Sequence, residues 1–333
     1  MFDISDFIKS VEGIIASHQL GTIGAYQRWK TQSPENNREM GIDPYGCADA
    51  ANILYTIGRF PSDQEERVEW IKTLQSLQES KTGLFSESTH HEIHTTAHCI
   101  AALELFDALP RHPLTALSQY KTPEKMEAFL DQLDWKEKPW QESHRGAGLY
   151  ASLVLSQEVS FEWEDRYFNW LYKNTDPATG FLRLDCITQS CNEHDIFPHL
   201  AGSFHYLFNQ QYARRPLPYP DAMVNSCLEI IHSNCFPLGT SIGFAEIDWV
   251  FCLTRSVRQS GHRHKEAISA LMEFMENYIP FLLKLDPLNN DGLNDLHALF
   301  GTMCCLAELQ TALPGQLKTK RPLHLVLDRR PFI

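Results

Sequence analysis

The sequence predicts an all-α fold built from six helical hairpins, and three observations lead to this prediction. A short apolar segment that opens with a polar or small residue recurs at steps of 49, 50, 51, 49 and 49 residues. The stretches between these segments space their apolar residues as an amphipathic helix does. No strand-like alternation separates the units, which favours a helical repeat protein. The equivalent positions of the six segments are Asp49, His98, Gly148, His199, Asp248 and His297.

Composition excludes several classes of function. The chain has 333 residues, 43% of them hydrophobic, which is enough for one large core. Its net charge is −13 and it holds no run of Lys or Arg, so we expect no nucleic-acid partner. A smaller anionic partner stays open, because an acidic protein can still hold a local cationic pocket.

Cysteine usage and hydropathy predict a cytoplasmic protein without a membrane span. Cys99, Cys252, Cys304 and Cys305 lie in apolar helical runs, which is typical of reduced, buried thiols. The first residues form an amphipathic pattern and not a signal peptide. No apolar run approaches the ~18 residues that a membrane helix needs. The sequence carries no signal of an oligomeric state.

Each unit pairs an amphipathic outer helix with a more apolar inner helix. A polar loop, 24–46, follows the first helix and is expected to cover one mouth of the fold. Glu273 and Glu276 mark the solvent side of the sixth outer helix. We expect outer helices at 5–17, 64–78, 123–133, 162–172, 221–232 and 264–285, and inner helices at 47–57, 94–105, 145–155, 199–208, 246–257 and 297–309.

A closed ring of hairpins is favoured over an open solenoid. The inner helices carry small residues such as Ala50, Ala101, Gly148 and Gly301, which permit close approach around a tight circle. We therefore expect a single domain over 1–320. The tail, 321–333, is expected to be an extended segment lying across the surface.

Two motifs carry a resemblance to known families. The segment WIKTLQSLQESKTGLF, followed by HTTAHCIAALELF, is similar to repeats of terpenoid cyclases and protein prenyltransferases, whose Gln, Gly and aromatic positions would be Gln78, Gly83 and Phe85. The stretch DPATGF, 176–181, is similar to loops of six-hairpin carbohydrate-active enzymes. The resemblance implies an (α/α)6 toroid over nearly the whole chain, with a central cavity at the inner helix starts.

The chain departs from the catalytic patterns of the first group. It has no DxDD motif of the cyclases that protonate an alkene. Prenyltransferases bind zinc through Asp-x-Cys on one inner helix and a His on the next. Asp248 and His297 match the Asp and the His, but Val250 stands where the Cys would be. A divalent metal such as Zn²⁺ is therefore an open prediction.

The inner helix starts supply the candidate site residues, with helix capping as the competing explanation. His94 and His98 form an HxxxH pair, which suits either a metal half-site or a partly exposed helix start. Asp248 between His199 and His297 is the strongest candidate for acid–base chemistry or for a metal site. We expect catalytic roles for Asp49, His98, His144, His199, Asp248 and His297, and substrate-binding roles for Tyr45, His94, Arg145, Asp195 and Asn294.

Three functions fit this ring. The first is an enzyme acting on a small-molecule or oligosaccharide substrate, by lyase, epimerase or hydrolase chemistry with His and Asp as acid and base. The second is an isoprenoid cyclase or prenyltransferase-like enzyme with a metal at Asp248 and His297. The third is a non-catalytic helical-repeat binding protein. We favour the first.

Overall fold

The protein is all-α, as predicted. The computed structural model describes residues 1–33, 38–187, 193–233 and 237–332, and for residues 193–195 it describes the backbone alone. The outer helices are α1 (Ser5–His18), α3 (Gln64–Ser76), α5 (Pro123–Gln132), α7 (Phe161–Asn174), α9 (Pro220–Ser233) and α11 (His264–Lys284). The inner helices are α2 (Pro44–Thr56), α4 (Glu92–Leu105), α6 (Pro139–Leu155), α8 (Glu193–Tyr212), α10 (Ala245–Ser260) and α12 (Leu296–Ala312).

Four short elements complete the description: β1 (Phe2–Asp3), β2 (Leu317–Lys318), the 3-10 helix η1 (Thr115–Lys121) and α13 (Val326–Arg329). Strand β1 pairs with β2 in parallel, which joins the two ends of the chain. None of the described helices is both long and apolar enough to cross a bilayer.

Two inner helices begin about six residues earlier than expected. Helix α6 begins at Pro139 instead of Arg145, since proline is tolerated in the first turn, where its missing N–H would have no partner. Helix α8 begins at Glu193 instead of His199 and contains Pro198. His144 therefore lies inside α6 and not in the loop before it, which matters for the site.

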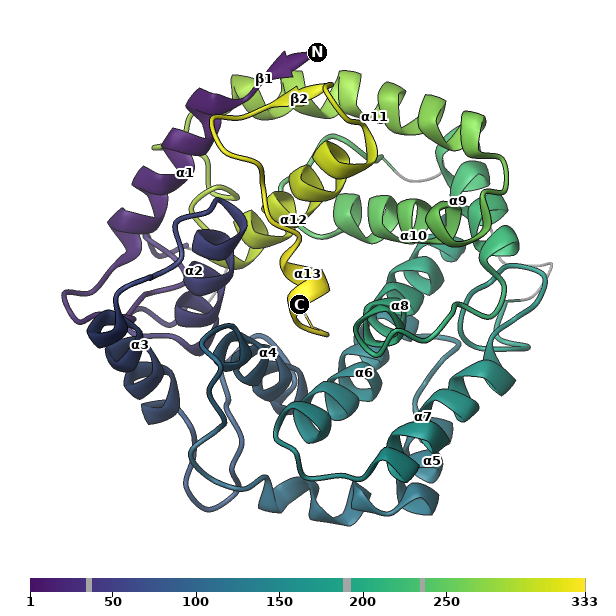
Figure 1. Ribbon diagram of the computed structural model, residues 1–333, viewed down its shortest axis with the longest axis horizontal. Helices are drawn as coiled ribbons and strands as arrows, with labels where there is room; N and C mark the ends of the chain where they lie inside the picture. The colour runs from purple at the N-terminus through teal and green to yellow at the C-terminus, as the bar shows by residue number, and fades with distance from the viewer. Residues whose placement is uncertain (34–37, 188–192, 234–236, 333) are drawn as a thin grey trace.

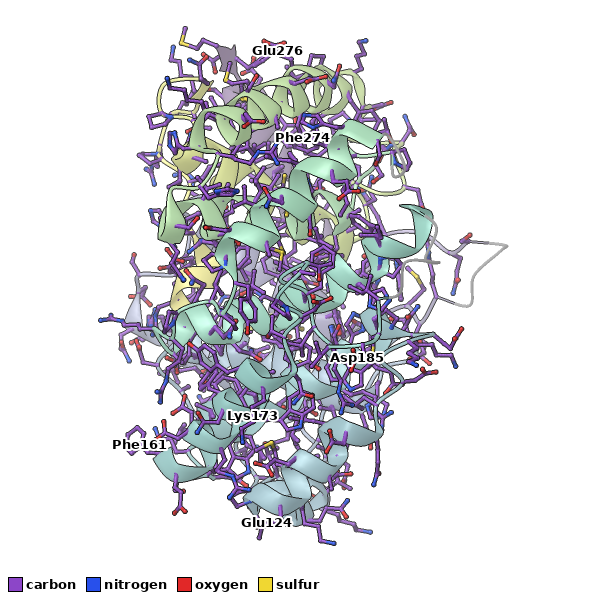
Figure 2. All side chains as sticks on the ribbon, turned by 90° about the vertical axis from the view of Figure 1, so that its right-hand side faces the viewer. Glu124, Phe161, Lys173, Asp185, Phe274 and Glu276 are labelled. Atoms are coloured by element: carbon purple, nitrogen blue, oxygen red, sulfur yellow. The ribbon has the colours of Figure 1, made fainter. Side chains whose placement is uncertain are left out.

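The six inner helices surround a common centre (Figure 1). Each packs against the next along the chain, and α12 packs against α2. Small residues permit these contacts: a Cβ on Gly146 would lie 2.0 Å from the Tyr206 hydroxyl, and one on Gly301 would lie 2.6 Å from the Gly243 carbonyl oxygen. The outer helices lie around this inner set, with amphipathic faces. On α11 Phe274 is buried whereas Glu273 and Glu276 are exposed, as predicted (Figure 2).

We expected the C-terminal tail to lie across the surface, and it does not. It enters the centre of the inner helices from their C-terminal ends (Figure 1). The His324 N–H donates to the Thr56 carbonyl at the end of α2, and Arg329 pairs with Glu104 at the end of α4, 2.6 Å away. Phe332 is fully buried. The apolar side chains that alternate along the tail fill the core instead of covering a surface.

We expect Phe332→Ala to destabilise the protein by about 3 kcal/mol, because the substitution removes a buried ring and leaves a cavity. Urea unfolding measures the change. The matched control is Phe161→Ala, since Phe161 is 87% exposed and its loss should change stability by no more than about 0.5 kcal/mol (Figure 2). Equal effects of the two substitutions would show that the tail does not contribute to the core.

Candidate functional site

A cavity of about 270 Å³ lies at the N-terminal ends of the inner helices. Five histidines share its wall, from one loop and four helices: His90 from the loop before α4, His94 from α4, His144 from α6, His205 from α8 and His297 from α12. The remaining lining residues are Arg28, Trp140, Phe244, Asp295 and Ala298. The described residues around the cavity form two groups of His and Asp side chains that could each hold a metal ion.

The first group is centred on Asp49 of α2, which is fully buried. His98 Nε2 lies 2.7 Å from Asp49 Oδ1, and His297 Nδ1 lies 3.3 Å from the same oxygen. Burial lowers the pKa of His98, and it lowers the pKa of His297 to about 3. Burial would raise the pKa of Asp49, but His297 and His98 hold it below its usual range. At neutral pH a carboxylate therefore accepts N–H bonds from two neutral imidazoles.

This geometry orients His297 as a base. With Nδ1–H bonded to Asp49, the lone pair of His297 is on Nε2, and the ring lines the cavity. The carboxylate also stabilises the imidazolium that forms when Nε2 accepts a proton. His98, in contrast, directs its Nε2 at Asp49 and is fully buried, so it holds Asp49 in place.

The second group consists of His94, His144 and His205, whose ring nitrogens lie within 4.8 Å of one another. Ring centroids are 4.3 Å apart for His94 and His144, and 4.7 Å apart for His144 and His205. Burial lowers the pKa of all three, and mutual repulsion lowers those of His94 and His144 further. For His205 the value is about 3. The three rings are therefore neutral at neutral pH.

Hydrogen bonds at Nδ1 set the orientation of two of these rings, those of His205 and His94. His205 Nδ1 lies 3.0 Å from the Ala201 carbonyl oxygen and 3.1 Å from Ser143 Oγ. His94 Nδ1 is hydrogen-bonded to the Tyr45 hydroxyl. In each ring Nδ1 is thus occupied and Nε2 is left for other partners.

Tyr45 connects the two groups. Its ring stacks on His98 at 4.7 Å and meets the edge of His297 at 4.4 Å, while its hydroxyl binds His94. Tyr45 is fully buried, and burial raises its pKa, so the phenol stays protonated.

A bidentate ion pair forms the rim of the cavity. Arg28, from the loop after α1, donates from Nε and a terminal nitrogen to the two oxygens of Asp295, at 2.9 and 3.1 Å. Trp29 Nε1 donates to Asp295 at 3.0 Å, and the same carboxylate caps α12 by accepting the His297 N–H. The polar loop therefore reaches this mouth of the fold, as the sequence indicated.

Several predicted site residues come together and others do not. Asp49 and His98 are neighbours, as their equivalent positions imply, whereas His94 and His98 belong to different groups and do not form one half-site. Asp248 is fully buried, and both its carboxylate oxygens lack a hydrogen-bond partner among the described residues. Burial raises the pKa of Asp248, which favours its protonated form. Helix α10 begins at Ala245, so Asp248 lies inside the helix and is not its N-cap. The described residues do not assemble His199, Asp248 and His297 into one metal-binding group.

The predicted binding residues divide in the same way. Tyr45 and His94 are in or beside the cavity, as is His144, for which a catalytic role was predicted. Arg145 pairs with Glu142 at 2.8 Å, and Asn294 donates to the carbonyls of Pro287 and Asn290. Both residues stabilise local structure. The side chain of Asp195 lies outside the described residues.

Sequence reasoning missed four polar residues of the cavity: Arg28, His90, His205 and Asp295. Arg28 and Asp295 are 267 positions apart in the chain, and no local pattern predicts such a pair. His205 lies six residues after the repeated position His199, which on a helix is a different face. Asp295 stands directly before an apolar helix, and that position is a capping signal which could have identified it.

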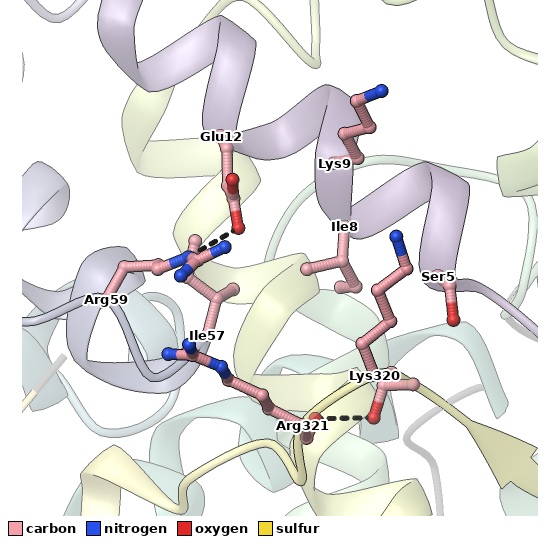
Figure 3. A pocket seen from close by; sticks show the side chains of 9 residues that line it. Ser5, Ile8, Lys9, Glu12, Ile57, Arg59, Lys320 and Arg321 are labelled. Carbon is pink, nitrogen blue, oxygen red and sulfur yellow. Dashed lines mark hydrogen bonds and ion pairs between the residues drawn. The ribbon is translucent and has the colours of Figure 1, made fainter.

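A second hollow of about 350 Å³ lies on the outside, between α1, the loop after α2 and the segment around Lys320 (Figure 3). Lys9, Arg59, Lys320 and Arg321 make it cationic. Arg59 is paired with Glu12 at 2.7 Å, and Arg321 donates to the Gly58 carbonyl at 3.0 Å. These contacts bind the N- and C-terminal segments to the ring, so the histidine cavity is the better candidate site.

No family model matches the chain, and no curated protein and no solved structure matches it.

Stability should fall below neutral pH because of His297. Its folded pKa of about 3 lies below the usual histidine value of 6.5, so the unfolded chain binds the additional proton between these values. The contribution is fully present above about pH 6.5 and is lost as the pH falls toward 3. This group alone should cost about 2 kcal/mol of unfolding free energy between pH 7 and pH 5.

His297→Asn keeps an N–H donor for Asp49 and removes this titration, so it should reduce the loss of unfolding free energy between pH 7 and pH 5, measured by urea unfolding, by about 2 kcal/mol. The other buried histidines, whose pKa values are also lowered, keep the rest of the pH dependence. The exposed His232→Asn is the control and should keep the wild-type slope. A wild-type slope in His297→Asn would show that His297 does not titrate in this way.

Proposed function

We propose that the protein is a cytoplasmic enzyme with an (α/α)6 toroid fold, and that it acts on a carbohydrate or a similarly small polyhydroxy acid in the histidine cavity. The reaction begins with removal of a proton from carbon, as in a lyase or an epimerase. One observation carries the proposal. His297 lines the cavity as a neutral imidazole, and its Nδ1 is hydrogen-bonded to the buried Asp49 carboxylate. The toroid class is supported by the closed contact of α12 with α2, and the cytoplasm by the buried free thiols.

The carboxylates argue against glycoside hydrolysis. That reaction uses two carboxyl groups on opposite sides of the scissile bond. Among the described residues, Asp295 is the carboxylate that lines the cavity, and Arg28 and Trp29 already bind it. Asp49 lies behind His98 and His297. Imidazoles, and not carboxyls, are therefore the groups that can meet a substrate.

A C–H bond next to a carbonyl or carboxylate group breaks, its proton moves to His297 Nε2, and the electron pair moves to the carbonyl oxygen as an enolate. Return of a proton from water to the other face of that carbon gives an epimer. In the alternative, the enolate electrons form a C=C bond, the C–O bond at the next carbon breaks with its electron pair on oxygen, and that oxygen takes the proton from His297 and leaves as a hydroxyl group. Aspartate-oriented imidazoles suit this role, since general-base catalysis contributes about 10²–10⁴-fold.

The size and wall of the cavity limit the substrate. About 270 Å³ is at the small end of ligand pockets, so one sugar ring or a molecule of similar size fits. Trp140 and Phe244 supply apolar faces on which such a ring can stack.

Exchange of carbon-bound hydrogen tests the reaction class. The purified protein is incubated in D₂O with aldoses, ketoses, uronates and acidic oligosaccharides, and NMR is used to detect deuterium at a carbon next to a carbonyl or carboxylate. A parallel absorbance assay detects unsaturated uronates. We expect wild-type exchange or elimination with at least one member of this panel.

His297→Asn should reduce that rate about 10²-fold or more, since the base is lost. His232→Asn, an exposed histidine far from the cavity lining, is the matched control and should retain it. Hydrolysis without exchange, or a His297→Asn protein as fast as wild type, would overturn the proposal.

A further inference from the structure

The geometry points to a transition-metal site formed by His94, His144 and His205, with Zn²⁺ as the ion that fits best. The three side chains come from α4, α6 and α8, which are consecutive inner helices, and their ring nitrogens lie within 4.8 Å of one another. Around an ion with Zn–N bonds of about 2.0–2.1 Å, tetrahedral ligands lie roughly 3.4 Å apart. Small rotations of the side chains would therefore bring the three nitrogens to one ion.

The hydrogen bonds of the group match those of metal-binding histidines. Such histidines give their other ring nitrogen to a carbonyl, carboxylate or similar partner, which sets the orientation of the ring. Here His205 Nδ1 faces the Ala201 carbonyl at 3.0 Å and His94 Nδ1 is bonded to Tyr45. In both residues Nε2 remains for the ion, and the rings are neutral, which is the form that binds metal.

Burial gives a second reason to expect an ion. Three imidazoles in contact lose their hydration without gaining a carboxylate among them, which is unfavourable unless their lone pairs find a common partner. His94 and His205 are nearly fully buried, whereas His144 is partly exposed. All three line the cavity, so three protein ligands would leave the fourth position for water or substrate.

The other group, Asp49, His98 and His297, fits an ion less well. Its members already bind one another, and His98 Nε2 lies 2.7 Å from Asp49 Oδ1. That separation suits a shared proton and is shorter than the roughly 3.4 Å between two ligands of one tetrahedral ion. The ligand type also selects the ion: three imidazoles favour Zn²⁺, Cu²⁺, Ni²⁺ or Fe²⁺ over Mg²⁺ and Ca²⁺.

An ion at this site would polarise the carbonyl oxygen of the substrate beside the carbon from which His297 takes a proton. This role depends on the proposed function, whereas binding of the ion does not. The two are therefore tested by separate measurements.

Metal binding is tested on the full chain after removal of bound metal with a chelator. Titration with ZnCl₂, followed by calorimetry and by elemental analysis after gel filtration, should give one ion per chain. Titration with Co²⁺ should give the intense visible absorption of a four-coordinate site. MgCl₂ should give no binding at the same concentrations.

Substitutions identify the ligands. His144→Gln and His205→Gln should each weaken Zn²⁺ binding at least 100-fold, and Tyr45→Phe should weaken it by about 10–100-fold by releasing His94. His90→Gln and His297→Asn change the same cavity outside the group and should keep one ion per chain. Because His205 is buried, circular dichroism is used to check its folding, and the partly exposed His144 gives an independent result.

Absence of Zn²⁺ binding by the wild-type chain at micromolar concentration would overturn the inference. So would binding that His297→Asn abolishes and His144→Gln leaves intact. Zinc binding without any carbon-hydrogen exchange would leave the metal site standing and remove the proposed reaction. Undiminished exchange by the chelator-treated protein would leave the proposed reaction standing and remove the proposed role of the ion in it.

Discussion

The Asp49 carboxylate is the interaction on which the site depends. It is fully buried, and two imidazoles from α4 and α12 converge on one of its oxygens. A carboxylate in such a place is stable only when donors satisfy it. Its partners belong to α4 and α12, the two inner helices that flank α2. The Asp49 carboxylate therefore also connects α2, the first inner helix, with α12, the last. Closure of the ring and orientation of His297 therefore have the same physical cause.

The repeat predicts the architecture well because it is a global constraint. Each unit must bury one amphipathic and one nearly apolar helix, so a period of about 50 residues determines element order and the pairing of outer with inner helices. It also predicts that equivalent positions on adjacent helices are neighbours, as Asp49 and His98 are. The bounds of the outer helices are predicted most accurately, because each of these helices has a polar face that the sequence reveals. On α11, Glu273 and Glu276 mark this exposed face.

The rotation of each inner helix about its own axis is less predictable. A helix that is buried on every side has no polar face to indicate which residues point at the centre. Asp248 and His205 illustrate the result. Asp248 occupies a repeated position and is buried without a hydrogen-bond partner among the described residues, and burial raises its pKa. His205 lies six residues beyond a repeated position and lines the cavity. Packing between neighbouring helices, and not local pattern, decides which polar residue faces inward.

The C-terminal tail connects stability to chemistry at this centre. Phe332 is buried 4.9 Å from the His94 ring and near His205, with its phenyl group against Gly148, where a larger side chain would meet it at 3.3 Å. The tail therefore closes the inner ring on the side opposite the Arg28–Asp295 rim. Exclusion of water from that side lowers the local dielectric, which strengthens the hydrogen bonds of Asp49 and makes protonation of the imidazoles more costly. The segment 324–332 thus occupies the space between the C-terminal ends of the inner helices, and the histidine cavity lies at their N-terminal ends.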